Sequence, residues 1–268
     1  MQGEKPCIFL HNGLPRPHKI AKGGIKAFMP DRKRTVVTDI ILILVFCAVF
    51  AVSFFPQNPV PIYGGKIVGA IYNGNRSSDN VSLMFNVYEN TETVNAIIDL
   101  LDERGAKATF FVGGCWADDN ADTLKKIVGG GHEIANHGYF HKDHAKLGYD
   151  KNREEIDLTG KITEALCGVK PKLFAPPSGS FSETTLEAAF DLGYTVVMWS
   201  KDTVDWRDKD KNKVFSRATN GVCGGDLILM HPKPHTLSAL PRILDYYEEA
   251  GLKAVTVSEN VSASAGKT

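Results

Sequence analysis

Histidines in the segment "NHGYFHKDH" are the clearest candidates for chemistry. His137 and His141 lie four positions apart, and His144 follows them. Two neutral imidazoles at this spacing can bind one metal ion where the chain turns helically. The chain holds 8 histidines, however, so a histidine-rich surface loop explains the same spacing. The pair therefore indicates a metal site only in combination with its surroundings.

Three further segments carry polar or aromatic candidates. "GDLILMH" ends on His231, which suits a general acid near neutral pH or a hydrogen-bonded core histidine. "MWSKDTVDWRD" places Asp205 beside Trp206, a pair that suits sugar recognition, because an indole ring stacks on the apolar face of a pyranose, or a solvated loop. "LFAPPSGSF" holds Pro177, which indicates a rigid turn or the wall of a ligand groove.

The elements that must position these residues alternate between strands and helices. Ser182 is a predicted helix N-cap and Gly105 suits the end of the helix before it. Such alternation implies parallel strands joined by right-handed crossovers. Seven strands in the outer part of the chain predict a barrel, closed or incomplete, rather than an open sheet. The predicted strands are 81–88, 106–112, 132–137, 172–177, 194–200, 226–231 and 253–258.

The carboxyl ends of these strands are the expected place for a site. The residues there are Asn86, His137, Pro176 with Pro177, Trp199 and His231. Polar or special residues thus follow five of the predicted strands at one end of the barrel.

Taken in order, the motifs H-x-x-x-H, P-P-x-G, D-x-x-D-W and L-M-H resemble the polysaccharide deacetylase family, the NodB-homology domain. The resemblance covers roughly residues 67–260, and "ATFFVGG", "GHEIANH" and "GDLILMHP" are similar to its typical phrasing. It implies an α/β fold, a distorted (β/α)7 barrel. It also implies a hydrolase that removes acetyl groups from N-acetylated sugars, with peptidoglycan of the cell wall as the expected glycan.

The resemblance also assigns roles. In this family an aspartate and two histidines hold a divalent metal, usually zinc, which polarises the acetamide carbonyl and activates a water. His137 and His141 match the metal histidines, and His231 matches the general acid. Asp205 with Trp206 matches the pair beside that acid, where the carboxylate would orient the imidazole. Trp206 and Pro177 are the expected substrate contacts.

The chain departs from the family at the end of the first predicted barrel strand. The family's "T-F-D-D-G" corresponds here to Met84–Tyr88. Asn86 stands in the position of the catalytic base, and an amide has no usable proton affinity at neutral pH. Val87 stands in the position of the metal aspartate, and Ala175 replaces the expected arginine. In this the chain resembles a divergent branch of the family that is associated with sporulation proteins.

Two functions follow from these losses. In the first, the protein is a metal-dependent N-deacetylase in which Glu92, or less readily Glu89, supplies a carboxylate as ligand or base, with Asp143 or His144 as other third ligands. Glu92 is equally explained as a first-turn helix residue favoured by the helix dipole. In the second, the protein is a catalytically inactive deacetylase fold that binds cell-wall glycan or a protein partner.

The amino-terminal part predicts a membrane anchor. "VVTDIILILVFCAVFAVSFF", residues 36–55, is long and apolar enough to span a bilayer, with Asp39 as its only charge. Basic residues before it predict a cytoplasmic amino terminus and a domain outside the cell. A cleaved signal peptide is the competing interpretation. Met29 is a candidate initiator, because residues 1–28 show no helical or strand periodicity.

Composition sets the remaining limits. The chain has 268 residues with 31 basic and 31 acidic side chains, which argues against a nucleic-acid binder. Its 5 cysteines form no C-x-x-C pair and indicate no disulfide framework. The predicted organisation is a basic cytoplasmic segment (1–35), the anchor, a stalk with an edge segment (56–80) and the deacetylase-like domain (81–268).

Overall fold

The structure is a computed structural model that describes residues 39–46, 62–63, 66–67 and 69–262. The chain divides into two compact units, Met1–Pro59 and Val60–Thr268. In the first unit the structure describes one helix, residues 39–46. A search of the described residues finds no helix long and apolar enough to cross a membrane. Most of the predicted anchor, like Met29, lies outside the described residues, so the anchor stays a prediction.

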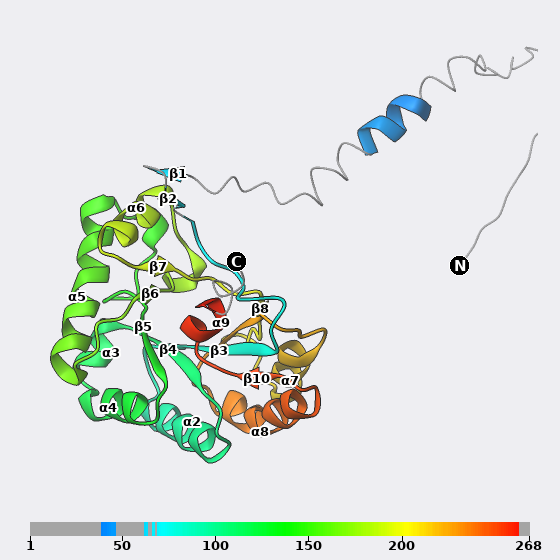
Figure 1. The fold of residues 1–268 in the computed structure, drawn as a ribbon. Helices are drawn as coiled ribbons and strands as arrows, with labels where there is room; N and C mark the ends of the chain where they lie inside the picture. The colour runs from blue at the N-terminus through cyan, green and yellow to red at the C-terminus, as the bar shows by residue number, and fades with distance from the viewer. Residues whose placement is uncertain (1–38, 47–61, 64–65, 68, 263–268) are drawn as a thin grey trace, which may run out of the picture. The chain divides into compact units, whose positions relative to one another are not determined.

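A parallel sheet of eight strands forms the centre of the second unit (Figure 1). The strand order is β7-β6-β5-β4-β3-β9-β8, and β10 pairs with the start of β3. Among the described residues β7 and β8 do not pair with each other, so the sheet curls without closing. The prediction of a parallel, barrel-like α/β fold is confirmed in its incomplete form. The strands are Asn80–Val87 (β3), Ala108–Val112 (β4), Glu133–Asn136 (β5), Leu173–Phe174 (β6), Thr195–Val196 (β7), Lys201–Asp202 (β8), Leu227–Met230 (β9) and Lys253–Ala254 (β10).

Helices follow the strands and cover the outer face of the sheet, as Figure 1 shows for α2, α4, α5 and α8. A short hairpin, β1 (Ile62–Tyr63) with β2 (Lys66–Ile67), precedes the sheet. The helices are Thr91–Glu103 (α2), Gly114–Asp118 (α3), Ala121–Gly129 (α4), Tyr149–Cys167 (α5), Glu183–Asp191 (α6), Lys211–Thr219 (α7), Pro234–Glu249 (α8) and Val257–Ser262 (α9). Two 3₁₀ turns, His144–Lys146 and Pro177–Gly179, interrupt the loops.

Local sequence explains where helices begin and end. Ser182 caps α6, because its hydroxyl accepts from the N–H of Thr185 while the Thr185 hydroxyl accepts from the N–H of Ser182, which confirms the predicted cap. Gly105, the second residue after the end of α2, adopts φ 62°, a conformation that glycine adopts without steric cost.

The last predicted strand is wrong over two thirds of its length. Residues 253–258 alternate apolar and polar side chains, but only Lys253–Ala254 form a strand. The helix α9 begins at Val257, and the hydroxyl of Thr256 accepts a hydrogen bond from the N–H of Glu259 at 3.2 Å. The helix cap at Thr256 therefore determines the local structure, although the side chains alternate as in a strand. β8 was not predicted, since two residues carry no periodicity.

The side chains of β3 alternate between two buried clusters. Phe85 and Val87 pack with the helices on the outer side of the sheet, whereas Met84 packs in the inner cluster with Phe111. Since side chains alternate along a strand, Asn86 shares the inner face with Met84. This register decides which residues at the strand end can reach a site inside the curl.

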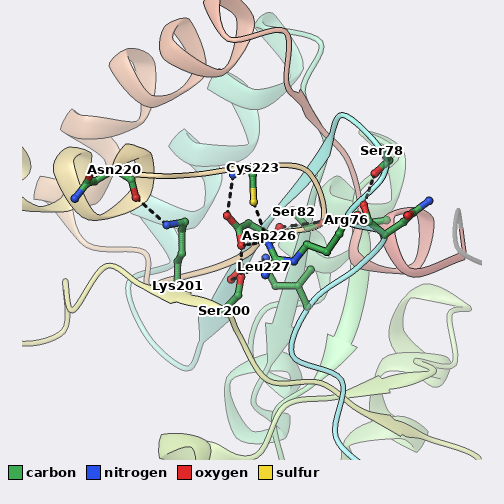
Figure 2. Close-up of polar contacts among 11 residues, drawn as sticks. Arg76, Ser78, Ser82, Ser200, Lys201, Asn220, Cys223, Asp226 and Leu227 are labelled. Carbon is green, nitrogen blue, oxygen red and sulfur yellow. Dashed lines mark hydrogen bonds and ion pairs between the residues drawn. The ribbon is translucent and has the colours of Figure 1, made fainter. Parts of the chain in front are cut away.

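A polar cluster holds the amino ends of β3, β8 and β9 together (Figure 2). Its centre is the carboxylate of Asp226, which is 2% exposed. Arg76 donates to it at 2.6 Å, the hydroxyl of Ser200 at 2.8 Å and the N–H of Cys223 at 2.9 Å. The segment before β3 is thereby fixed to the segment before β9.

Candidate functional site

A cavity of about 330 Å³ opens at the carboxyl ends of the strands. It receives residues from the ends of β3, β8 and β9 and from the loops that follow β5, β6 and β7. This is the place expected for a site in a parallel barrel. The lining residues are Asn86, Tyr88, His137, His141, Ser178, Trp199, Asp202, Trp206, Leu229 and His231.

Six of the residues singled out in the sequence therefore meet in one cavity, namely Asn86, His137, His141, Trp199, Trp206 and His231. Three others, Glu92, Pro177 and Asp205, do not line it. Glu92 is an exposed residue in the first turn of α2, as its alternative interpretation had it. Pro177 is buried in the 3₁₀ turn after β6, and its neighbour Ser178 lines the cavity instead.

Asp205 lies directly behind His231. One carboxylate oxygen accepts from Nδ1 of His231 at 2.7 Å, and the other accepts from the His231 N–H and the Thr236 hydroxyl, each at 2.7 Å. Burial alone would raise the pKa of Asp205. The hydrogen bonds outweigh burial and lower the pKa, and the bond from His231 contributes most. The charged carboxylate therefore fixes the orientation of the imidazole.

His137 is also held through Nδ1, but by a backbone carbonyl rather than a carboxylate. Its Nδ1 lies 2.7 Å from the carbonyl oxygen of Ala175, so Nδ1 carries the proton and Nε2 keeps its lone pair. Burial, followed by the neighbouring His141, lowers the pKa of His137 well below its usual value. Burial also lowers the pKa of His141, whose ring centre lies 5.1 Å from that of His137. Both imidazoles are neutral at pH 7.

The loop between β5 and α5 carries both histidines, and Glu155 of α5 holds it in place. The carboxylate of Glu155 accepts from the N–H groups of Tyr139 at 3.0 Å and Phe140 at 2.7 Å. His141 itself adopts φ 54°, a left-handed conformation that costs about 1–2 kcal/mol for such a residue. The loop is thus shaped by a buried acceptor rather than by its own preferences.

The ring of Tyr88 lies beside the histidines of the cavity. Its ring centre lies 4.4 Å from that of His141, 6.5 Å from that of His137 and 6.4 Å from that of His231. Lys233 lies 6.0 Å from the ring centre and forms an ion pair with Glu89. Burial raises the pKa of Tyr88, so its phenol stays protonated.

Tyr88 was not predicted as a functional residue. The signal in the sequence was its position, because it stands where the family has a glycine, which has no side chain. Trp199 was among the strand-end residues expected at the site, and it lines the cavity. Asp202 was seen in the sequence only as the first residue of D-x-x-D-W, and its place in the cavity became clear with the fold.

The residues present do not fit a three-ligand zinc site. Val87 is fully buried in the outer cluster and has no donor atom. Within the described ranges no group of three His, Cys, Asp or Glu side chains is placed to hold a metal. His144 is buried and bonds to Asn152 at 2.7 Å, while Asp143 is bonded by Ser180 and Lys146. None of the carboxylates named from the sequence reaches the two histidines.

Comparison with known proteins gives a consistent result. The profile of the family described as polysaccharide deacetylase matches residues 73–197. The chain is 36% identical over 189 residues to YlxY of Bacillus subtilis, covering 70% of this chain and 59% of that protein. It is 31% identical over 191 residues to a peptidoglycan-N-acetylglucosamine deacetylase of Bacillus cereus, covering 69% of this chain and 70% of the relative.

Among solved structures, BA3943 of Bacillus anthracis, described as a CE4 family pseudoenzyme, is similar with a TM-score of 0.71 and 31% identity. The match covers 74% of this chain and 70% of that chain. A mutant of BA3943 described as having restored enzymatic activity matches with the same TM-score and 30% identity.

Proposed function

Because this chain belongs to the polysaccharide deacetylase family, we propose that it binds the amino-sugar glycan of the cell wall without a metal-dependent reaction. The glycan class is that of N-acetylated polymers such as peptidoglycan. The B. cereus relative is named for such a substrate. The cavity at the carboxyl ends of the strands is the binding site.

One observation carries this proposal. Asn86 puts an amide in the position of the base, and Val87 puts an apolar side chain, buried outside the cavity, in the position of the metal ligand. Tyr88 adds a ring beside His141 where the family has a glycine. Catalysis by a metal-bound water needs a third ligand and a base, and among the described residues no such set of ligands is placed at the cavity. Loss of a general base alone typically costs about 10²–10⁴-fold in rate.

The aromatic lining supports glycan binding. Tyr88, Trp199 and Trp206 all line the cavity, and Trp206 is 52% exposed at its rim. Exposed aromatic rings provide contact area for the apolar face of a sugar ring at low entropic cost. The rings that line the cavity are therefore suited to contact a glycan.

The test is retention of the full-length protein on insoluble peptidoglycan. Trp206→Ala is expected to lower retention about tenfold, because removing a central aromatic contact typically costs at least 1 kcal/mol. Tyr246→Ala, which removes an exposed aromatic on α8, is the matched control and should bind as the unaltered protein does. Equal retention of both variants would refute binding through this cavity.

A slow N-deacetylase is the second candidate, and the Asp205–His231 pair favours it. The 2.7 Å hydrogen bond leaves Nε2 of His231 free to protonate a leaving amine. In this case acetate would be released from N-acetylated glycan in the presence of Zn²⁺, and His231→Ala would abolish the release. Zinc titration by calorimetry on the full-length chain separates the candidates, since binding that His137→Ala abolishes favours the enzyme.

For localisation, we propose that residues 36–55 anchor the protein in the cell membrane, with the deacetylase-like domain outside. The apolar length of that segment and the basic residues before it support this. Protease added to intact cells should then remove the domain. Protection of the domain until the cells are lysed would refute the orientation.

A further inference from the structure

We infer that the cavity favours a hexosamine whose nitrogen is free, a de-N-acetylated sugar within the glycan, over the N-acetylated form. The inference rests on the proposed glycan binding and specifies which sugar of the polymer the cavity recognises. Three features of the lining support the inference. They are acceptors without a hydrogen-bond partner, a carboxylate without an ion pair among the described residues, and aromatic rings.

The acceptors lie at the carboxyl ends of β3 and β5. Oδ1 of Asn86 and Nε2 of His137 are buried and have no hydrogen-bond partner. The proton on Nδ1 of His137 is committed to the carbonyl oxygen of Ala175, so Nε2 can only accept. A buried acceptor without a partner is costly, and a ligand that donates hydrogen bonds here recovers that cost.

The carboxylate is that of Asp202 at the end of β8. It lines the cavity, and one of its oxygens accepts from the N–H of Val204 at 2.7 Å. Across the part of the chain that the structure describes, Asp202 makes no ion pair. Arg207 interacts electrostatically with Asp202, but its ion pair is with Asp208. Lys233, near the ring of Tyr88, is paired with Glu89. A cationic ligand would therefore meet an unpaired negative charge.

The aromatic rings favour the same ligand. Tyr88, Trp199 and Trp206 line the cavity, and the faces of such rings attract cations. An ammonium group offers three donors and a positive charge. An acetamide offers one N–H, brings no charge and adds a carbonyl that needs a donor of its own. The lining as a whole therefore suits the free amine better.

The test is isothermal calorimetry of the full-length chain with two ligands, the tetramer of glucosamine and the tetramer of N-acetylglucosamine, at a pH where the amine is protonated. The glucosamine tetramer is expected to bind about tenfold more tightly, as one charge-assisted hydrogen bond provides. Asp202→Asn keeps the shape of the side chain and should reduce this preference about fivefold. Glu187→Gln on the exposed face of α6 removes one charge elsewhere and should change neither affinity.

Each outcome decides something. Equal or tighter binding of the N-acetylated tetramer would overturn the inference and leave the proposed glycan binding intact. Failure to bind either tetramer would count against both the inference and the proposed glycan binding. If a folded Asp202→Asn variant, checked by circular dichroism, kept the full preference, the Asp202 carboxylate would not be its cause and the inference would be refuted. If that variant does not fold, the comparison of the two tetramers on the unaltered protein still decides.

Discussion

At the scale of single residues, Val87 and Tyr88 are the departures from the family pattern that bear on metal binding. Val87 is 0% exposed and packs in the outer cluster, so a carboxylate at this position has no solvent and no cation. Val87→Asp is expected to lower the free energy of unfolding by about 3 kcal/mol at pH 7, the cost of an unpaired buried charge. Denaturant unfolding measures this, and Val87→Asn, which cannot ionise, is the control whose effect should not vary with pH.

Adding Tyr88→Gly to Val87→Asp should create a response to zinc. Removing the ring opens space beside His141, and glycine at position 88 lets the end of β3 turn the new carboxylate from the outer cluster toward the two histidines. We expect Zn²⁺ to raise the melting temperature of the double variant and to leave that of Val87→Asp unchanged. A zinc-dependent rise in the single variant would show that Tyr88 does not exclude a metal.

Much of the site was predictable residue by residue. His137, His141, Asp205 and His231 sit in motifs whose spacing the family shares, and the fold brings them to one end of the sheet. Tyr88 was not predictable as a central residue, because a sequence shows what replaced a glycine but not where the new ring goes. Of the two interpretations of Glu92, the first-turn helix residue agrees with the structure, in which Glu92 is exposed at the start of α2.

At the scale of elements, α5 supports the histidine loop. The Glu155 carboxylate accepts from two consecutive backbone N–H groups, and Lys142 lies 3.1 Å from it. Glu155→Gln is expected to destabilise the loop by about 2 kcal/mol, because hydrogen bonds to a charged acceptor are lost or weakened. Faster hydrogen exchange at the amides of Tyr139 and Phe140 would report the change.

The adjacent residue Glu154 provides the control for this prediction. Glu154 lies on the exposed side of α5, where it pairs with Lys151. Glu154→Gln removes the same charge from the same helix turn and should leave exchange in the loop unchanged. If both variants increased exchange equally, the effect would belong to the charge of α5 rather than to the contacts of Glu155.

The sequence specified the longer elements better than the short ones. β3 and α2 were found within one or two residues, since their buried side chains repeat at strand or helix spacing over many positions. β6 and β7 are two residues each, against six and seven expected. The prolines after β6 explain part of this, because they lack the N–H that a parallel ladder requires.

At the scale of the whole molecule, the amino ends of the strands hold the fold and the carboxyl ends hold the cavity. Asp226 joins the segment before β3 to β9 through Arg76, and its carboxylate is almost fully buried. Burial raises the pKa of Asp226, but the hydrogen bonds from Cys223, Ser200 and Arg76 outweigh it and lower the pKa. In the folded protein this carboxyl therefore gives up its proton more readily than in the unfolded chain.

Stability must then depend on pH in a defined direction. The contribution of Asp226 is fully present above its unfolded pKa of about 4 and is lost as the pH falls through the lower folded value. Asp226→Asn is expected to cost about 2 kcal/mol at pH 7 and progressively less below about pH 4. Asp245→Asn, which breaks a surface pair with Arg104, is the control and should cost little at any pH. Denaturant unfolding across pH measures both variants, and a cost of Asp226→Asn that stays constant through acid would refute this account of the cluster.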